Sequence, residues 1–353
     1  MTDGAGKTHR VLVAGGGPVG LFAALVVVRS GFSVSVVEPR ATPIDKACGE
    51  GLMPGGLAQL RAVGVDPVGR DFRGIRYLTA DGGTSAEADF RAGPGRGVRR
   101  TVLQEALHGA AVESGVQVVP DRVVEVRNDD GGVSVRLGSG EWLAGEYLLA
   151  ADGLHSPVRR LAGVASHSPG PARFGLRQHF DVEPWTDVVE VHWSDRSEAY
   201  VTPVADGVVG VAVLGAGQGR DLTEELSAFP ELAARLARGR ALDRPRGAGP
   251  LRQVVSGRVR GRTLLVGDAA GYVDALTGEG LSVGFASARA AAHSIVAGRP
   301  QDYEAEWRRA SRRYRWITRS VLEVATRGPT RRAVVPLASA WPWAFGRAVD
   351  ALA

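Results

Sequence analysis

The chain has 353 residues, of which 44% are hydrophobic and 23% are charged, a balance typical of a globular protein with a sizeable core. Lysine and arginine exceed aspartate and glutamate by 43 − 38 = 5, and so small a basic excess argues against a nucleic-acid-binding protein. The single cysteine, Cys48, excludes a disulfide framework within the chain, and the histidines show no metal-ligand spacing. No apolar run is long enough to span a bilayer and no signal peptide is evident, so we expect a cytoplasmic protein with a disordered leader at residues 1–9.

Residues 10–40 contain the strongest motif of the chain. An apolar run at 11–14 predicts a buried strand, and residues 15–20 satisfy G-x-G-x-x-G. Residues 21–30 are helix-compatible, and residues 32–37 predict a second strand that ends at Glu38. Strand, glycine turn, helix, strand and acid in this order predict a dinucleotide-binding unit rather than a turn without a ligand.

The glycines of this motif have separate tasks in a dinucleotide-binding turn. Gly15 permits the sharp turn after the strand, Gly17 lets the backbone approach a pyrophosphate, and Gly20 lets the helix pack close to the strand. The helix that begins near Pro18 directs its free N–H groups toward the phosphates. Glu38 is placed to accept ribose hydroxyls and to repel a 2′-phosphate, so we expect FAD or NAD rather than NADP at this site.

The remaining chain divides into segments of two kinds. Residues 98–114 predict a helix and residues 116–137 short strands, which we interpret as a β-meander inserted in the nucleotide-binding sheet. Residues 147–151 and 263–266 are apolar runs typical of buried parallel strands. Between them, alternating runs within 173–214 predict antiparallel strands of a second sheet, and residues 221–238 predict a helix.

The C-terminal tail has its own pattern. Residues 302–327 predict an arginine-rich helix, and the residues after it are apolar and aromatic, with Trp341 and Trp343. A basic helix followed by tryptophans favours contact with a membrane surface in some proteins. We favour packing of this tail on the nucleotide-binding domain over membrane contact.

Three segments carry a family resemblance. GGGPVG with Glu38, AADGLHSPVR, and LLVGDAAGYVDALTGEGLSVGF, in that order, resemble the FAD-dependent oxidoreductases with the para-hydroxybenzoate-hydroxylase fold. That superfamily includes aromatic monooxygenases, flavin halogenases, and geranylgeranyl or menaquinone reductases. The halogenase motif W-x-W-x-I-P is not found in the sequence.

Two departures from the hydroxylase pattern refine the resemblance. Gly271 and Glu279 stand where aromatic hydroxylases carry His and Gln, and with KACGEG at 46–51 this variant is similar to the geranylgeranyl-reductase branch. Reductases of long prenyl chains in that branch typically have several aromatic residues on a strand that ends in proline. The matching stretch at 199–203 has only Tyr200, which argues against a bulky isoprenoid substrate.

The resemblance implies an α/β fold, with a Rossmann-like FAD-binding domain that carries a β-meander, an inserted antiparallel-sheet substrate domain, and C-terminal helices. The expected boundaries are 10–71, 98–165 and 261–300 for the FAD-binding domain, 72–97 and 166–260 for the substrate domain, and 301–353 for the helical tail.

The resemblance also assigns residues to FAD, which would lie extended across the first sheet. Arg100 matches an arginine that pairs with the phosphates or the ribityl chain, Asp268 matches the acid that accepts a ribityl hydroxyl, and Asp152 with Gly153 matches the family's DG motif. The full set of candidate cofactor residues is Gly15, Gly17, Pro18, Gly20, Glu38, Arg40, Cys48, Arg100, Val124, Asp152, Gly153, Asp268, Gly278 and Gly280.

The reacting end of the cofactor is expected at two loops. The loop 276–280 leads into a helix whose N-terminus would stabilise the negative charge of reduced flavin, which makes Gly278, Glu279 and Gly280 candidates for the catalytic loop. Cys48 lies in the loop that faces the flavin in the reductase branch. It is a candidate proton donor, with a small buried apolar residue as the alternative.

Four residues on the strands of the second sheet are candidates for substrate contact. Arg177, His179 and His192, with Glu190 beside them, either line a substrate cavity or lie on the solvent face of that sheet, and Tyr200 is the fourth candidate.

The function that the resemblance implies is an FAD-dependent oxidoreductase that consumes NAD(P)H. The leading expectation is a monooxygenase that hydroxylates or epoxidises a small aromatic or polycyclic substrate through a flavin C4a-hydroperoxide. One alternative is a flavin-dependent reductase of a carbon–carbon double bond, and another is a flavoprotein associated with a membrane surface.

Overall fold

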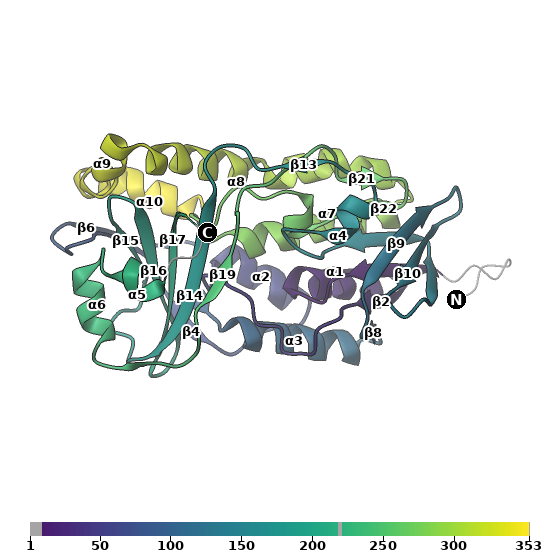
Figure 1. Ribbon diagram of the computed structural model, residues 1–353, viewed down its shortest axis with the longest axis horizontal. Coiled ribbons are helices and arrows are strands. Elements are labelled where there is room, and N and C mark those ends of the chain that lie inside the picture. Colours follow the sequence, from purple (N-terminus) through teal and green to yellow (C-terminus); the bar gives the residue numbers. More distant parts are fainter. Residues whose placement is uncertain (1–8, 218–220, 353) are drawn as a thin grey trace.

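The computed structural model describes residues 9–217 and 221–352. Two large β-sheets lie at opposite ends of an elongated molecule, and the longest helix runs along its upper side (Figure 1). The leader expected at residues 1–9 falls, apart from His9, outside the described residues.

The first sheet has six strands in the order β21-β22-β12-β1-β2-β8. All neighbours pair in parallel except β21, which pairs with β22 antiparallel. The carboxyl ends of β1, β2, β12 and β22 therefore meet at one edge, which is where open α/β sheets bind ligands. The strand bounds are β1 (Arg10–Ala14), β2 (Ser33–Val37), β8 (Gln117–Val119), β12 (Tyr147–Ala150), β21 (Val259–Arg260) and β22 (Thr263–Leu265).

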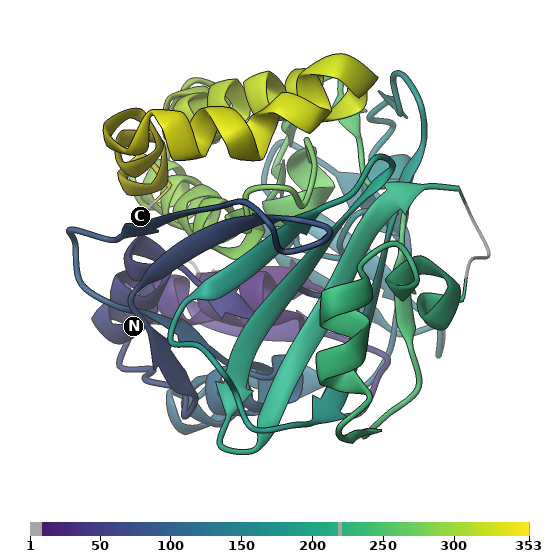
Figure 2. The ribbon, with the colours of Figure 1, turned by 90° about the vertical axis from the view of Figure 1, so that its left-hand side faces the viewer.

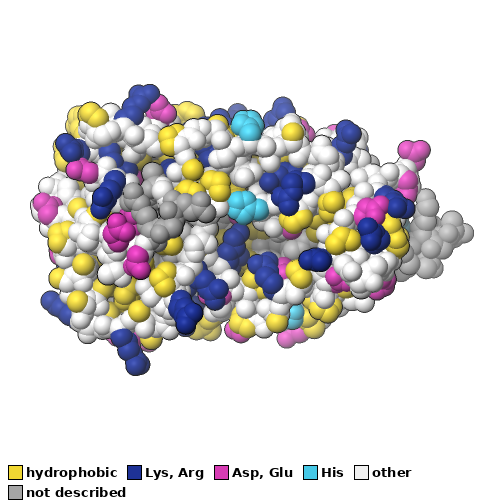
Figure 3. All heavy atoms as spheres, viewed as in Figure 1, with side chains coloured by type: hydrophobic (Ala, Val, Ile, Leu, Met, Phe, Trp, Pro, Cys, Tyr) yellow, Lys and Arg dark blue, Asp and Glu magenta, His cyan; other side chains and the backbone are white. Residues whose placement is uncertain are grey.

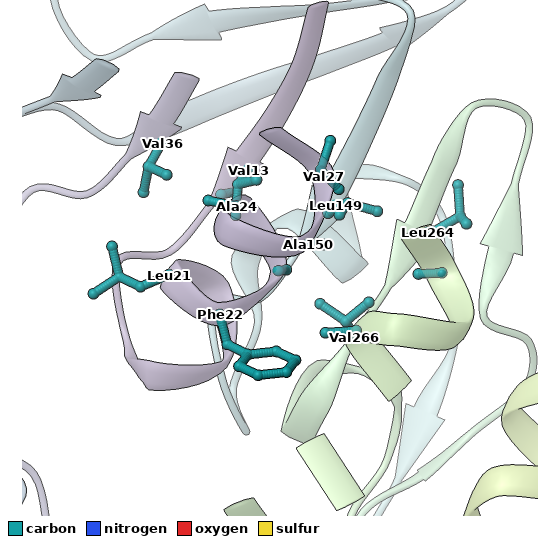
Figure 4. Close-up of a cluster of buried hydrophobic side chains, with 14 of the residues drawn as sticks. Val13, Leu21, Phe22, Ala24, Val27, Val36, Leu149, Ala150, Leu264 and Val266 are labelled. Atoms are coloured by element: carbon teal, nitrogen blue, oxygen red, sulfur yellow. The ribbon is translucent and has the colours of Figure 1, made fainter. Parts of the chain in front are cut away.

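Helices cover this sheet and complete the main core. Phe22 of the first helix lies against Phe285 of a helix far away in sequence, with ring centroids 4.5 Å apart. The side chains around Phe22, Leu149 and Val266 are buried and apolar (Figure 4). The helices on this side are α1 (Pro18–Arg29), α2 (Pro54–Ala62), α3 (Arg100–Glu113), α4 (Pro157–Leu161), α7 (Gly280–Val296) and the 3-10 helix η1 (Gly267–Ala270).

The β-meander is not part of the nucleotide-binding sheet, and that detail of the prediction is wrong. β9 (Val123–Asn128), β10 (Val133–Leu137) and β11 (Trp142–Gly145) form a separate three-stranded antiparallel sheet. Their short hairpins pair the strands with one another, so only β8 joins the parallel sheet from this part of the chain.

The second sheet has eight strands. Seven lie in the order β18-β14-β17-β16-β15-β5-β6, and β19 pairs with β14 beside them. Every pair is antiparallel except β15 with β5. The bounds are β5 (Gly74–Thr79), β6 (Ser85–Asp89), β14 (Arg173–Asp181), β15 (Val189–Trp193), β16 (Ser197–Ala205), β17 (Val208–Ala216), β18 (Arg240–Ala241) and β19 (Arg246–Ala248).

The helix predicted over 221–238 is instead two helices, α5 (Leu222–Leu226) and α6 (Pro230–Leu236). Pro230 lacks a backbone N–H and begins α6, which interrupts the continuous helix that the sequence pattern suggested. Both helices pack on the outer face of the second sheet, nearest the viewer in Figure 2. Two further sheets are small. One has three strands, β3 (Gly51–Leu52), β7 (Gly95–Gly97) and β4 (Arg70–Phe72), and the other pairs β13 (Ser166–His167) with β20 (Val254–Val255).

The C-terminal tail forms α8 (Tyr303–Thr326), α9 (Gly328–Ala340) and α10 (Pro342–Asp350), preceded by the 3-10 helix η2 (Pro300–Asp302). The start of α8 packs into the core of the first sheet through Tyr303 and Trp307. α9 and α10 pack on the second sheet instead, where Phe345 lies 4.9 Å from Tyr77 between ring centroids. The tail thus bridges the two sheets along the upper edge of Figure 2.

Within the two described ranges, no helix combines the length and apolar character needed to cross a bilayer. The boundaries between an FAD-binding and a substrate domain stay a prediction.

Candidate active site

A single large cavity of about 600 Å³ extends from the carboxyl edge of the first sheet to the inner face of the second. This volume lies within the range of about 300–1,000 Å³ that is usual for ligand sites. Figure 3 shows basic side chains gathered around a hollow in the middle of one face of the molecule. Of the predicted site residues, the cavity brings together Gly17, Pro18, Arg40, Cys48, Arg100, Asp152, Gly153, Arg177, Tyr200, Asp268, Gly278 and Gly280.

The glycine turn after β1 has the geometry that the motif predicts. Gly15 has φ +106°, and a Cβ there would lie 2.6 Å from the carbonyl oxygen of Ala151. A Cβ at Gly20 would lie 1.9 Å from the carbonyl oxygen of Gly15, so only glycine lets α1 approach the strand this closely. Gly17 is different, because a Cβ there would meet only Arg100 Nη2, at 3.7 Å, and the residue lines the cavity, where backbone can approach a phosphate.

Glu38 is buried behind this turn rather than exposed in the cavity. Its carboxylate accepts hydrogen bonds from the Gly16 N–H at 2.8 Å and from the Arg40 backbone and guanidinium at 2.8–3.0 Å. Burial by itself raises the pKa of Glu38, but the hydrogen bonds from Arg40 and Gly16 outweigh burial and hold the pKa below its ordinary value. A carboxylate offers about four acceptor positions, so a ribose hydroxyl binds Glu38 only when the Arg40 side chain, 56% exposed, turns away.

The surroundings of Arg100 show whether the carboxyl edge of the first sheet fits FAD. Its Nε atom is buried and has no hydrogen-bond partner among the described residues, and Nη2 lies 3.7 Å from the open Cβ position of Gly17. The neighbouring Arg99 also has an unpartnered Nε, but only Arg100 lines the cavity. An unpaired guanidinium beside a glycine turn at a helix N-terminus fits the pyrophosphate of FAD.

Asp152 and Asp268 end neighbouring strands, yet they differ in what they bind. The Asp152 carboxylate accepts hydrogen bonds from the Ser156 hydroxyl and from the Val158 N–H at 2.8 Å, which caps α4. Burial raises the pKa of Asp152 above its ordinary value. Asp268 lies 4.0 Å from Lys46 Nζ, and its side chain is 34% exposed, so its carboxylate remains accessible to a ribityl hydroxyl.

The loop that carries Cys48 is held in place by the second sheet. The Thr202 hydroxyl donates to the Gly49 carbonyl at 2.9 Å, and His179 Nε2 lies 2.6 Å from Glu50 Oε2. Glu50 is buried and has φ +60°, a left-handed conformation that is uncommon for a residue other than glycine. Its other oxygen accepts the Arg100 N–H at 2.7 Å, so one carboxylate links the Cys48 loop, the second sheet and the start of α3.

The loop before α7 is tied to the second sheet in the same way. The Tyr200 hydroxyl donates to the Leu276 carbonyl at 2.7 Å. Gly278 has φ +70° and Gly280 lies against the Tyr272 ring, so both glycines permit a close turn beside the cavity. Glu279 does not line the cavity, and its burial raises its pKa to about 7, although Arg313 lowers it.

The inner face of the second sheet forms an apolar wall of the cavity. Side chains alternate along a strand, so Val189 and Val191 face the cavity while Glu190 and His192 face α6. The structure does not bring His192 to the cavity, since His192 contacts Glu190 at 3.2 Å and lies near Phe229. We expected His192 either to line a cavity or to lie on the solvent face of the second sheet. It does neither, because α5 and α6 cover that face of the sheet.

His179 also lies outside the cavity lining, and Arg177 lies at its margin. Arg177 pairs with Asp45 and, at 2.8 Å, with Asp243, while His179 Nδ1 lies 2.6 Å from Asp243. Val124 lies on β9, away from the cavity. Gly15 and Gly20 shape the turn from behind without lining it.

Sequence reasoning missed Glu50, Lys46 and Thr202 as site residues. Glu50 and Lys46 stand within the segment KACGEG that carries the resemblance, so a signal was present for them. No sequence signal pointed to Thr202, because its role depends on a hydrogen bond to Gly49, 153 positions away in the chain. No group of three or more His, Cys, Asp or Glu residues within 9–217 and 221–352 is arranged to hold a metal ion.

A parallel sheet with a glycine turn, an acid after its second strand and an unpaired arginine over the turn define a dinucleotide-binding flavoprotein. Residues 8–298 match the family described as FAD binding domain, and the chain belongs to this family. The predicted fold, an FAD-binding domain with added antiparallel sheets and C-terminal helices, is confirmed.

The relatives act in two different reaction classes. The chain is 30% identical over 327 residues to the menaquinone reductase of Mycolicibacterium smegmatis, a match that covers 84% of this chain and 78% of the relative. It is 28% identical over 306 residues to the rifampicin monooxygenase of Streptomyces venezuelae, covering 79% of this chain and 62% of the relative. A solved flavoprotein/dehydrogenase from Cytophaga hutchinsonii shares the fold, with a TM-score of 0.77 at 20% identity over 97% of this chain and 96% of the other.

Proposed function

We propose that this flavoprotein takes electrons from NAD(P)H and reduces a carbon–carbon double bond in an apolar substrate. The observation that carries the proposal is the position of Cys48, which lines the cavity together with the apolar wall of the second sheet. Bound FAD supplies the hydride for such a reduction. The second carbon needs a proton, and the thiol of Cys48 is the protein group suited to hold it there.

The other cavity residues bind and orient. Gly17, Pro18 and Arg100 line the cavity where they would hold the phosphates of the cofactor, and Asp268 would accept a ribityl hydroxyl. Val191, Leu214 and Phe174 exclude water and orient an apolar substrate against the sheet. The Glu50 N–H lies 3.4 Å from Cys48 Sγ and orients the thiol.

The second candidate is the monooxygenase that the sequence pattern placed first. Tyr77, Phe174 and Tyr200 give the cavity an aromatic lining suited to a small aromatic or polycyclic substrate. The similarity to the rifampicin monooxygenase supports this reaction, and the longer match to the menaquinone reductase supports reduction. We rank reduction first because the Cys48 thiol, a candidate proton donor, lies on the cavity wall.

Oxygen dependence separates the two reactions. FAD-loaded protein is supplied with NADPH or NADH, a menaquinone with an unsaturated side chain, and a panel of small aromatic compounds, with and without oxygen. Reduction predicts a product that gains two hydrogen atoms without oxygen. Incorporation of isotopically labelled oxygen, with no product under anaerobic conditions, would establish the monooxygenase instead.

Cys48 variants test the proton donor within the same assay. Cys48→Ala should lower the rate of product formation at least tenfold while FAD binding is retained, and Cys48→Ser should recover part of the loss. Equal rates in wild type and Cys48→Ala would remove the thiol from the mechanism and with it the observation that favours reduction.

Membrane contact is a further proposal for the same protein, which we otherwise place in the cytoplasm. Trp316, Trp341 and Trp343 are 71%, 56% and 69% exposed on the C-terminal helices, and α8 is rich in arginine. Such side chains suit an anionic lipid surface. Cutting the chain after Arg327 would uncover the second sheet, so the test is sedimentation of the intact protein and of Trp341→Ser/Trp343→Ser with anionic vesicles, and equal sedimentation would reject membrane contact.

A further inference from the structure

A second, smaller cavity shares the side chain of Tyr272 with the main one. Its volume is about 40 Å³. We call it the arginine pocket, because four arginines line it together with a buried serine: Arg252, Arg258, Ser311, Arg315 and Arg319. Arg252 and Arg258 flank β20, and the other three residues lie on α8, so the pocket joins segments distant in the sequence.

Among the residues that the structure describes, a carboxylate compensates the positive charge of the arginine pocket only at Arg258. Arg258 Nη1 lies 3.0 Å from Glu304 Oε1, and the same carboxylate oxygen also serves Arg308 at 3.1 Å. In the part of the chain that the structure describes, Arg252, Arg315 and Arg319 form no ion pair with a carboxylate. Three arginines therefore gather at one cavity without an anion of the protein.

Two of these guanidinium groups lie over one ring. Arg258 lies 3.8 Å and Arg315 5.0 Å from the centroid of Trp307. Stacking uses the faces of the guanidinium planes and leaves N–H donors at their edges for an oxyanion. Burial lowers the pKa of Arg315, and the charges of Arg319, Arg258 and Arg308 lower it further, so the cluster repels itself until an anion joins it.

Ser311 provides an independent sign of a ligand. It is 1% exposed, and its hydroxyl oxygen has no hydrogen-bond partner among the residues at 9–217 and 221–352. A buried hydroxyl without a partner is costly, and native proteins rarely keep one without a purpose. An oxygen of a bound anion would accept the hydrogen bond that Ser311 lacks.

We propose that the arginine pocket binds a phosphate group, either free phosphate or the phosphate monoester of a larger ligand. A water needs about 10–15 Å³ of such space, so this pocket has room for an ion of phosphate size and not for a nucleotide. Planar guanidinium edges and a hydroxyl are the donors that recognise phosphate oxygens. The shared wall at Tyr272 makes the 2′-phosphate of NADPH one possible source. The proposal goes beyond the proposed function and does not depend on turnover.

Calorimetric titration of inorganic phosphate into the full-length FAD-loaded protein tests the site, with ionic strength held constant by chloride. Wild type should show saturable binding of phosphate, and Arg319→Gln should weaken the Kd at least tenfold. Arg309→Gln is the matched control, because it removes the same charge from an exposed position of the same helix outside the pocket. Ser311→Ala should weaken the Kd several-fold without changing the net charge.

Two results would overturn the proposal. One is absence of saturable phosphate binding to the wild type. The other is equal weakening by Arg309→Gln and Arg319→Gln, which would show a general effect of charge. Steady-state kinetics then identify the source: a KM that rises for NADPH but not for NADH in Arg319→Gln supports the dinucleotide, and unchanged KM values with weakened phosphate binding support free phosphate or another monoester.

Discussion

The two large sheets build their halves of the active site by different means. The parallel sheet uses backbone, since Gly15, Gly17 and Gly20 shape its binding turn and its interior is apolar. The eight-stranded sheet uses long charged and polar side chains that are buried and paired. They are Arg173, Arg177, His179, Glu190, Glu198 and Thr202. Several of these side chains reach loops, so one sheet presents the glycine turn and the other holds the loops that face it.

The largest expected effect tests the backbone side of this contrast. Gly20→Ala would bring a Cβ within 1.9 Å of the Gly15 carbonyl oxygen, so α1 must move away from β1. We expect a loss of at least about 3 kcal/mol in the free energy of unfolding, since overpacking of this kind cannot relax against backbone. Urea unfolding and the flavin content of the purified protein measure it.

Gly109→Ala is the control for that change. Gly109 lies within α3 and has nothing within 4 Å of its Cβ position, so alanine there should be neutral or stabilising. A Gly20→Ala protein that keeps its flavin and its unfolding midpoint would show that the close approach of α1 and β1 is not required.

The next effect tests the buried charges of the second sheet. Glu198 is fully buried. Its carboxylate pairs with Arg173 at 2.7 Å and with Arg331 of α9 at 2.5 Å. Glu198→Ala leaves Arg331 without a carboxylate partner and Arg173 with Asp274 alone, which costs about 3 kcal/mol in the free energy of unfolding. Chemical denaturation followed by tryptophan fluorescence measures the loss.

An exposed pair between the same two elements provides the comparison. Asp195 and Arg332 also join the β15–β16 connection to α9, but their side chains are 69% and 73% exposed. Asp195→Ala should therefore cost less than about 1 kcal/mol. Similar losses for Asp195→Ala and Glu198→Ala would mean that burial of the charge does not set its contribution.

The same contrast explains what could be predicted from the sequence. The glycine turn, Glu38 and the apolar strands are local patterns whose spacing alone dictates strand, turn and helix, and the parallel sheet follows from them. The break at Pro230 was also present in the sequence but was outweighed by the helical pattern around it. Arg40 as the partner of Glu38 could not be predicted, because it depends on the rotamer of one exposed side chain.

The second sheet was harder to predict because both of its faces are covered. Alternation along β15 separates His192 from Val191, but it does not say which face meets the cavity. His179 and Thr202 act on a loop more than a hundred residues earlier, and no local pattern records such a contact. The arginines of α8 could be predicted as a basic helix, while their convergence with Arg252 and Arg258 required the fold.

A pH dependence sharpens the comparison, because burial changes the pKa of Glu279 more than its charged neighbour Arg313 does. Burial raises its pKa to about 7 in the folded protein, against about 4.5 for an unperturbed glutamate. The folded state therefore retains a proton that the unfolded state releases, and this contribution to stability is complete below pH 4.5 and lost as the pH rises to 7. Glu279→Gln should gain stability relative to wild type between pH 5 and pH 8.

Thermal melts of both proteins at the two pH values measure this gain. Arg313 lowers the pKa of Glu279, so Arg313→Gln should extend the loss of stability to higher pH. A difference in Tm between wild type and Glu279→Gln that stays constant with pH would assign the carboxyl an ordinary pKa and contradict the prediction.

The smallest expected effect compares a hydrogen bond that holds a loop with a hydrogen bond within the parallel sheet. Thr202→Val removes the hydrogen bond to the Gly49 carbonyl and keeps the shape of the side chain, so stability should fall by about 1 kcal/mol. Thr263→Val removes a comparable hydrogen bond, to Asn128 at 3.2 Å, from the parallel sheet. Because Thr202, unlike Thr263, holds the Cys48 loop against the cavity, FAD affinity measured by flavin fluorescence should weaken several-fold in Thr202→Val and stay unchanged in Thr263→Val. Equal affinities in the two variants would mean that the loop keeps its position without the second sheet, and the division of labour between the sheets would not hold.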